Sequence, residues 1–368
     1  MKIALMAPLW ETVPPKAYGG TELVVYILCE EFVRRGHEVT LFASGDSKTS
    51  ATLMPIIEKS MRELKVKNPF NYELQAIAKL LECWQEFDII HNHMGYQFLP
   101  FVNLVNIPIV TTLHGAFVFQ EENECYERYK HLPYISISDS QRNGSPGLNY
   151  TATVYNGIQV DKYKFEKEPI IDRPYLVFLG RMSQEKGPHL AIQLAKKTGW
   201  KLIMAGKVDV HDHVYFETQV KPLIDNKQII FIGELGHDAK VELLKGAYAT
   251  IHPVTWPEPF GLVMAESMAC GTPVLALNQG SIPEVVKNGV TGYVENDIDS
   301  LTKHVKDIEK IDRYACRKHV EENFSAHRMA EGYLATYKKL IAQKPAKINL
   351  GIEVSSRINL MKGNNTKI

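Results

Sequence analysis

Short apolar runs alternate with segments of helical periodicity along the first half of the chain. A buried helical stripe with i, i+3, i+4, i+8 spacing follows the first run, at Val24, Ile27, Leu28 and Phe32. Gly36 then ends the predicted helix. This alternation indicates a parallel sheet with helices on both faces. Strands are predicted at 2–7, 38–43, 88–91, 107–113, 134–138 and 152–155.

A polar, charged segment at 159–173 interrupts the pattern and is interpreted as a linker. Beyond it the alternation restarts, with strands predicted at 175–179, 201–205, 228–232, 249–254 and 273–277. Helices are predicted at 187–197, 211–224 and 238–246. A last helical stripe follows at Met329, Tyr333 and Tyr337, with apolar positions four residues apart.

The complete pattern predicts an α/β protein with two Rossmann-like, doubly wound domains that face a central cleft. We place the N-terminal domain at 1–160 and the C-terminal domain at 174–325. A C-terminal helix at 326–342 is expected to pack back on the N-terminal domain. The polar residues at 343–368 indicate a loosely ordered tail.

Composition narrows the class of protein. The 368 residues carry a formal net charge of zero, so nothing in the bulk charge points to nucleic acid. Five scattered cysteines without a C-x-x-C pair indicate reduced thiols in a cytosolic protein, not disulfides or structural zinc. No apolar run is long enough to span a membrane. The segment 59–67 mixes basic and apolar residues, which a solvated helix face explains better than attachment to a membrane surface, although attachment stays open.

The stretch from His252 to Gly271 is the most informative one. An apolar strand breaks at two prolines, and a helix follows whose first turn is predicted at Phe260, Gly261, Leu262 and Val263. Free N–H groups and the helix dipole favour an anion at such a terminus. Glu258 and Glu266 flank it, about 12 Å apart if the intervening residues were helical, which suits the two ends of one long ligand. Alternatively, Glu258 is an ordinary loop acid and Glu266 a solvated helix residue.

Two cations follow the first strand of the second half. Arg181, next to Gly180, and Lys186 lie on either side of one strand-to-helix loop. An Arg fork and a Lys point charge together suit a diphosphate. Ordinary surface charge paired with Glu185 is the alternative. No acid-rich cluster accompanies the cations, so we expect them to act in place of a metal ion.

Weaker signals lie in the first half. The pair Gly19–Gly20 after Tyr18 allows a close approach of the backbone to a phosphate, or is only a turn. His114 follows a buried strand and faces the predicted cleft, although a lone histidine at such a place is more often structural, and His91 and His93 are interpreted as structural. Two further turns are equally compatible with a structural role or a place at the cleft, at Asn156 and at 280–284.

Together these motifs resemble a known family. G-R-x-x-x-E-K-G at 180–187, the stretch H-P…E-P-F-G-L-V-x-x-E-x-M-A-x-G-x-P-V and the S-I-P-E turn are similar to the retaining glycosyltransferases of family 4, which have the GT-B fold. The segments G-G-T-E, T-L-H-G and V-Y-N-G-I match as well, and the resemblance covers about residues 1–342. One departure is Gln159, where many relatives have Asp.

The resemblance implies a role for each matching residue. Arg181 and Lys186 would hold the donor diphosphate, together with Gly19 and Gly20 from the other domain. Glu258 and His114 would face the transferred sugar, and Glu266 would bind the ribose hydroxyls. Backbone N–H groups would come from Phe260, Gly261 and Leu262, with Gly180 and Val263 also donor-binding. Tyr18 and Asn156 are further cleft residues.

The resemblance also implies the reaction. A sugar would pass from a nucleotide-diphosphate sugar to an acceptor hydroxyl of unknown identity, with retention of configuration and without a metal or other cofactor. The donor would bind the C-terminal domain and the acceptor the N-terminal domain. A UDP-sugar such as UDP-glucose is favoured, with GDP-mannose next. A nucleotide-sugar epimerase, a phosphorylase and a non-catalytic nucleotide-sugar sensor remain as alternatives.

Overall fold

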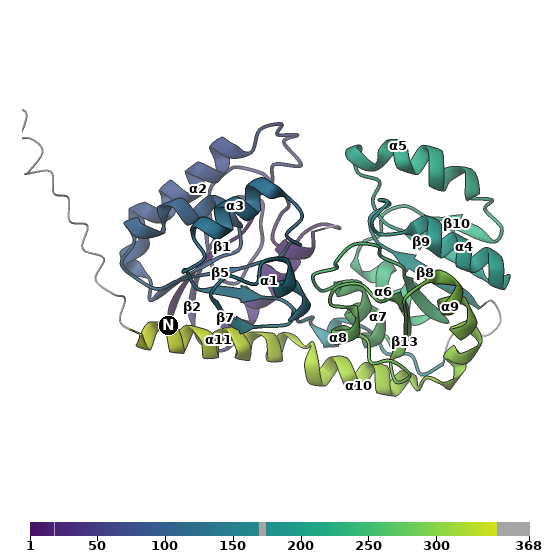
Figure 1. The fold of residues 1–368 in the computed structure, drawn as a ribbon. Coiled ribbons are helices and arrows are strands. Elements are labelled where there is room, and N and C mark those ends of the chain that lie inside the picture. Colours follow the sequence, from purple (N-terminus) through teal and green to yellow (C-terminus); the bar gives the residue numbers. More distant parts are fainter. Residues whose placement is uncertain (18, 169–173, 344–368) are drawn as a thin grey trace, which may run out of the picture.

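Two parallel sheets form the frame of the protein, each covered by helices on both faces (Figure 1). The computed structural model describes residues 1–17, 19–168 and 174–343. The predicted site residue Tyr18, the end of the predicted linker at 169–173 and the predicted tail from 344 onward lie outside the described residues. The expected α/β class with two doubly wound domains is confirmed.

The N-terminal sheet has the strand order β3-β2-β1-β4-β5-β6-β7, and all its pairs are parallel. Alternate residues of the central strand β1 enter two different cores, which explains its continuous apolar sequence. Ile3 packs with α1 (Gly20–Arg34), and Ala4 with α2 (Phe70–Cys83). The strands are β1 (Lys2–Met6), β2 (Glu38–Ala43), β3 (Thr52–Pro55), β4 (Ile89–Asn92), β5 (Ile109–Thr112), β6 (Tyr134–Ser136) and β7 (Tyr150–Thr153).

The C-terminal sheet repeats this architecture with the order β10-β9-β8-β11-β12-β13. On its central strand, Leu176 packs with α4 (Pro188–Thr198) and α9 (Ile298–Lys303). Val177 packs on the other face with α6 (His237–Lys245) and α7 (Leu262–Ala269). The strands are β8 (Tyr175–Leu179), β9 (Lys201–Ala205), β10 (Ile229–Phe231), β11 (Ala249–His252), β12 (Val274–Leu277) and β13 (Gly292–Glu295).

Two helical expectations are wrong. The helix predicted at 211–224 is broken into 3-10 turns at Val210–Asp212 and Lys221–Leu223, the short α5 (His213–Tyr215) and a π-turn at Phe216–Val220. Pro222 contributes to the break because it has no N–H for a helical bond. The segment 59–67 forms turns instead of a solvated helix, since Met61 and Arg62 donate their backbone N–H groups to residues 9 and 10.

The remaining helices are α3 (Gln120–Arg128), α8 (Ile282–Val285), α10 (Arg313–Asn323) and α11 (Ala326–Ala342). Further 3-10 turns lie at Trp84–Glu86, Tyr96–Leu104, Ser140–Gly144, Val160–Lys162 and His304–Lys310. Within the described ranges, none of the helices has the length and apolar character that crossing a membrane requires.

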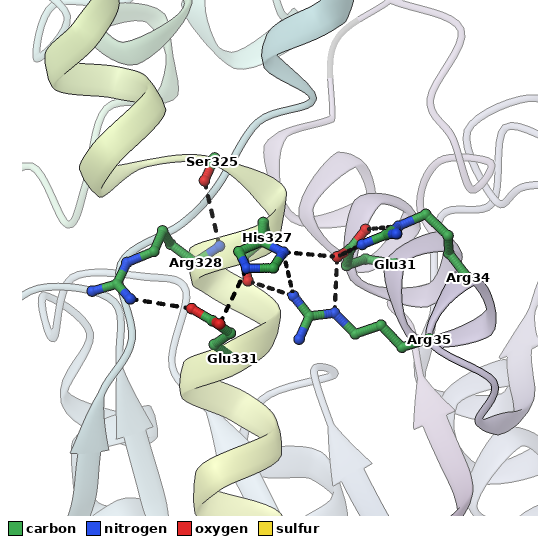
Figure 2. A network of polar contacts seen from close by, with 7 residues as sticks. All are labelled: Glu31, Arg34, Arg35, Ser325, His327, Arg328 and Glu331. Atoms are coloured by element: carbon green, nitrogen blue, oxygen red, sulfur yellow. Dashed lines mark hydrogen bonds and ion pairs between the residues drawn. The ribbon is translucent and has the colours of Figure 1, made fainter.

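The helix α11 returns from the C-terminal domain and lies along the N-terminal one (Figure 1). Its residues Met329, Tyr333 and Tyr337 are buried in the same core as α1. Figure 2 shows the polar contacts that accompany this packing: Arg35, the residue after α1, donates to the carbonyl oxygen of His327 at 2.9 Å and to Glu31 Oε1 at 2.9 Å.

The two segments that connect the domains lie side by side. Ile158 donates its N–H to Phe324 O at 2.8 Å, and Ala326 donates to Ile158 O at 2.8 Å. A Cβ on Gly157 would lie only 2.4 Å from Ser325 O, so this close approach requires glycine. The chain therefore leaves the N-terminal domain and returns to it through one paired crossover.

Candidate functional site

A cleft of about 480 Å³ is lined by residues of both domains. In each sheet the strand order reverses between two central strands, β1 and β4 in the first and β8 and β11 in the second. Ligands of doubly wound proteins bind beside the carboxyl ends of the strands at such a point. The cleft lining includes Trp10 after β1, His114 after β5, Arg181 after β8 and Glu258 after β11. The sheets thus bring both reversal points to one cavity.

The N-terminus of α7 lies in the wall of this cleft. The helix begins at Leu262, two residues later than expected, because Gly261 has a left-handed φ of 78° and acts as the N-cap. A Cβ on Gly261 would come within 2.6 Å of the Met264 side chain. Phe260 is buried before the helix, and all four residues predicted as its first turn, Phe260 to Val263, line the cleft.

Glu258 is fixed by a cation and an indole. Its carboxylate accepts from Lys186 Nζ at 2.5 Å and from Trp256 Nε1 at 2.8 Å, and the Lys186 ammonium lies 4.8 Å from the centre of the Trp256 ring. Only 6% of Glu258 is exposed, which excludes its interpretation as an ordinary loop acid. Burial opposes ionisation, but the charge of Lys186 and the hydrogen bonds from Lys186 and Trp256 outweigh it, and the pKa of Glu258 lies below its ordinary value.

Glu266, on α7, is also buried, with 3% of the residue exposed, so its interpretation as a solvated helix residue is wrong. Tyr163 donates its hydroxyl to Glu266 Oε1 at 2.8 Å, and Lys240 Nζ donates to the same oxygen at 2.5 Å. Burial and the neighbouring Glu266 carboxylate raise the pKa of Tyr163 well above its ordinary value, so Tyr163 is a neutral donor. The cleft wall therefore holds a second fixed carboxylate.

Arg181 lines the cleft. It also pairs with Glu185, which is the contact that the alternative interpretation as an ordinary surface charge predicts. Its Nε lies 3.4 Å from Asp212 Oδ2. The neighbouring Gly180 lines the cleft as well, and a Cβ on Gly206 would come 1.8 Å from Gly180 O. The guanidinium is thus positioned beside the cleft by two acids, Glu185 on its own loop and Asp212 in the turn Val210–Asp212.

The glycines of the first half lie opposite α7. Gly19 is the N-cap of α1 with a φ of 154°, and a Cβ there would come 2.6 Å from Pro15 Cβ. A Cβ on Gly20 would lie 3.7 Å from Leu262 Cδ1 of the other domain. Both glycines line the cleft, so the N-termini of α1 and α7 flank the same space.

His114 lines the cleft and donates to or accepts from His93, with Nε2 and Nδ1 2.8 Å apart. Burial lowers the pKa of His114 to about 4, so the ring is neutral near pH 7. His93 in turn contacts His91 at 3.1 Å. The two histidines expected to be structural are buried, and they form a continuous hydrogen-bonded chain with the cleft residue.

Two cleft residues, His252 and Glu22, were not identified from the sequence, and a third, Asn156, was only a weak candidate. His252 Nε2 and Asn156 Oδ1 are buried cleft atoms without a hydrogen-bond partner among the described residues, and ligands satisfy such atoms. Burial lowers the pKa of His252 to about 4. Glu22, in the first turn of α1, also lines the cleft, and burial raises its pKa to about 7. Among these only Asn156 had been considered, because it stands in a turn motif.

The turn at 280–284 supports the site from outside the cleft lining. Gly280 has a φ of 57°, and a Cβ there would lie 2.4 Å from Glu258 backbone atoms. Glu284 accepts from the backbone N–H groups of Asp139 and Ser140 at 2.8 and 2.7 Å. The turn thus positions Glu258 and joins the two domains. Across the cleft they also meet in an ion pair of Arg62 with Asp209 at 3.6 Å.

No metal centre is found in the described part of the chain, where histidine, cysteine, aspartate and glutamate side chains do not gather into a group of three or more that could hold an ion. Cationic side chains line the cleft, Arg181 and Lys186 among them, and the N–H groups at the start of α7 add partial positive charge. The arrangement can bind an elongated anion between two buried carboxylates.

Two family models match the chain. The one described as "Glycosyl transferases group 1" matches residues 159–324, and the one described as "Glycosyltransferase Family 4" matches residues 18–142. Among the relatives, an uncharacterised glycosyltransferase of Methanocaldococcus jannaschii is 26% identical to this chain, over 92% of this chain and 98% of its own length.

Solved structures show the same architecture. The sucrose-phosphate synthase from Thermosynechococcus elongatus has a TM-score of 0.79 at 18% identity, over 93% of this chain and 99% of its own. The Anabaena protein HepE, crystallised with UDP-glucose, has a TM-score of 0.71 at 21% identity, over 92% of this chain and 100% of its own. At these identities the likeness is one of fold.

Proposed function

This chain belongs to the glycosyl transferases group 1 and has the GT-B fold, and from that premise we propose that it moves a sugar from a UDP-sugar to an acceptor hydroxyl with retention of configuration. One observation carries the proposal. The N-terminus of α7 and two cations, Arg181 and Lys186, line a cleft between two buried carboxylates, Glu258 and Glu266.

Cleavage of the bond between sugar and phosphate develops negative charge on the diphosphate. Arg181, Lys186 and the N–H groups at the start of α7 are placed to stabilise that charge, and one such preorganised donor is worth ~10²–10³ in rate. These groups supply the positive charge that a metal ion supplies in other transferases, so the reaction is proposed to need no metal. Gly19 and Gly20 approach the same phosphates from the N-terminal domain.

The sugar and the ribose occupy opposite ends of the site in this proposal. Glu258, held by Lys186 and Trp256, accepts hydrogen bonds from hydroxyls of the sugar. His114 faces the sugar from the other domain. Glu266 accepts from the ribose hydroxyls, and the structure of HepE in complex with UDP-glucose supports a uridine donor. The acceptor enters from the N-terminal side of the cleft.

Retention follows in this proposal from attack on the same face that the diphosphate leaves. The leaving phosphate takes up the proton of the acceptor hydroxyl, so no protein nucleophile is required. Closure of the two domains excludes water, which would otherwise hydrolyse the activated sugar. The pairing of Ile158 with Ser325 holds the two connecting segments together, so in this proposal both would move as one when the domains close.

A thermal-shift panel of nucleotide sugars tests the donor class. UDP-glucose is expected to raise the Tm more than GDP-mannose does, and Glu266→Gln should remove most of that shift. Transfer is then assayed with candidate acceptors and with EDTA present. Isomerisation of the donor in the absence of an acceptor would indicate an epimerase, and dependence on free phosphate would indicate a phosphorylase. Binding of a nucleotide sugar without turnover would indicate a sensor. Each of these results would overturn the proposal.

A further inference from the structure

A chain of hydrogen bonds leads from the cleft to the returning helix α11. His114 Nε2 lies 2.8 Å from His93 Nδ1, and His93 Nε2 lies 3.1 Å from His91 Nδ1. Tyr337 of α11 places its hydroxyl 2.5 Å from the same His91 Nδ1. The other His91 nitrogen, Nε2, lies 2.7 Å from Thr112 Oγ1. The three imidazoles and the phenol thus form one connected path.

Each ring in this path is neutral. His91 and His93 are fully buried, and burial lowers the pKa of each well below its ordinary value. A neutral imidazole has one donor nitrogen and one acceptor nitrogen. Each hydrogen bond between two rings needs one donor nitrogen and one acceptor nitrogen. The nitrogen that holds the proton on one ring therefore determines which nitrogen holds it on the next ring.

The bond between Tyr337 and His91 indicates the direction of donation along the path. A phenol O–H is a stronger donor than a neutral imidazole N–H, so Tyr337 donates to His91 Nδ1. His91 then has its proton on Nε2 and donates to Thr112, whose hydroxyl donates to Tyr333 Oη at 3.3 Å. The donors and acceptors on this side of His91 are consistent with one another.

The same logic continues toward the cleft. The single lone pair of His91 Nδ1 is then shared by two donors, the Tyr337 hydroxyl and, at the longer distance of 3.1 Å, a protonated His93 Nε2, and the neutral His93 ring has an unprotonated Nδ1. His114 must then donate from Nε2 to His93. Its remaining nitrogen, Nδ1, has a lone pair and makes no hydrogen bond to the described residues, while the ring lines the cleft.

We propose that Tyr337 is a positioning residue that acts through His91 and His93 to fix His114 as the Nε2–H tautomer, so that Nδ1 of His114 accepts a hydrogen bond from a hydroxyl of the transferred sugar. The identity of that ligand rests on the proposed function, whereas the tautomer does not. The returning helix α11 thereby has a part in the site, although Tyr337 lies outside the cleft lining.

Tautomers are measured directly by ¹H–¹⁵N correlation spectra of the full chain with ¹⁵N-labelled histidine, without ligand, at pH 8. The His114 signals are assigned by comparison with His114→Gln. The expected result is a protonated Nε2 and an unprotonated Nδ1 on His114 in the wild-type protein. A His114 ring with its proton on Nδ1, or with both nitrogens protonated, would overturn the proposal whether or not any variant folds.

Tyr337→Phe keeps the buried ring and removes only the donor. It should shift His114 toward the Nδ1–H tautomer and lower kcat/KM for the donor about two- to tenfold. The lower value corresponds to an equal mixture of the two tautomers, and the higher value to complete loss of one hydrogen bond to the sugar. Tyr134→Phe is the matched control, since Tyr134 is a fully buried tyrosine whose hydroxyl donates to Tyr129 O at 3.0 Å. The control should change neither the tautomer nor kcat/KM.

An unchanged His114 tautomer in Tyr337→Phe would refute the role of the phenol. If no nucleotide sugar serves as a donor, the proposed function fails, yet the spectra of the wild-type protein and of Tyr337→Phe still decide the tautomer. The two failures are therefore distinguishable.

Discussion

Lys186→Met removes the ammonium from the buried pair with Glu258 and retains a side chain of similar length. Glu258, with 7% of its side chain exposed, would keep one hydrogen-bond donor to its carboxylate among the described residues, Trp256 Nε1. Loss of one partner from a buried pair costs about 3 kcal/mol or more. For a domain of this size that corresponds to a decrease of roughly 6–12 °C in Tm.

The second variant, Lys186→Met with Glu258→Gln, removes both charges. Replacement of a buried pair by neutral groups is close to neutral, so its stability should return to within about 1 kcal/mol of the wild type. Transfer should stay ~10²–10³ lower in both variants, because the ammonium is proposed to stabilise the leaving diphosphate. Stability and catalysis are thereby separated in a folded protein.

Urea unfolding at pH 5 and pH 8, together with a transfer assay, measures both effects. Without Lys186 the pKa of the buried Glu258 rises above its value in the unfolded chain. The single variant therefore keeps its stability at a pH below the unfolded pKa of Glu258 and loses stability as pH rises through the folded pKa. The deficit of the single variant should therefore be larger at pH 8. Equal stability of the single and double variants, or wild-type transfer by the double variant, would refute the reasoning.

Three further predictions follow from the same structure. Glu266→Gln should weaken UDP binding about tenfold in calorimetry through loss of charged hydrogen bonds, and an unchanged Kd would contradict this role. The folded pKa values of His114 and His252 lie at about 4, below an unfolded value of about 6.5. Between those limits each histidine should therefore lower the unfolding free energy by about 1.4 kcal/mol per pH unit as pH falls, and a flat profile of urea stability against pH would exclude this. Gly157→Ala should lower the Tm by several degrees because its Cβ would lie 2.4 Å from a carbonyl oxygen of the returning segment, whereas Gly236→Ala, with open space around it, should not.

The alternation of apolar runs was sufficient to predict the architecture. The strands at 38–43, 175–179 and 201–205 were predicted to the residue, because strands buried on both faces are continuously apolar. The strands β3 and β13 were missed. Both are short edge strands, one containing Pro55 and the other beginning at Gly292, so neither has a long apolar run.

The site was predictable where its residues stand together in the sequence. Arg181, Lys186, Glu258 and Glu266 were identified from motifs and their spacing, and the structure places all four at one cleft. Their partners were not predictable in the same way. Lys186 meets Glu258 across 72 positions, and Tyr163 meets Glu266 across 103, so only the fold brings them together.

The chain from His114 to Tyr337 illustrates the same limit. Each of its residues has an ordinary local explanation, as a strand residue or as part of a buried helical stripe. Tyr337 and His91 are 246 positions apart, and their contact depends on the return of α11 to the N-terminal domain. Periodicity predicts that such a helix is buried but does not identify the polar atoms that it meets.

A crystal structure of the protein with UDP tests the central claim most directly. The account predicts the diphosphate between Arg181, Lys186 and the N-terminus of α7, with a ribose hydroxyl within hydrogen-bond distance of Glu266. A nucleotide bound outside the cleft between the domains, or within it but away from Lys186 and Glu266, would contradict the account.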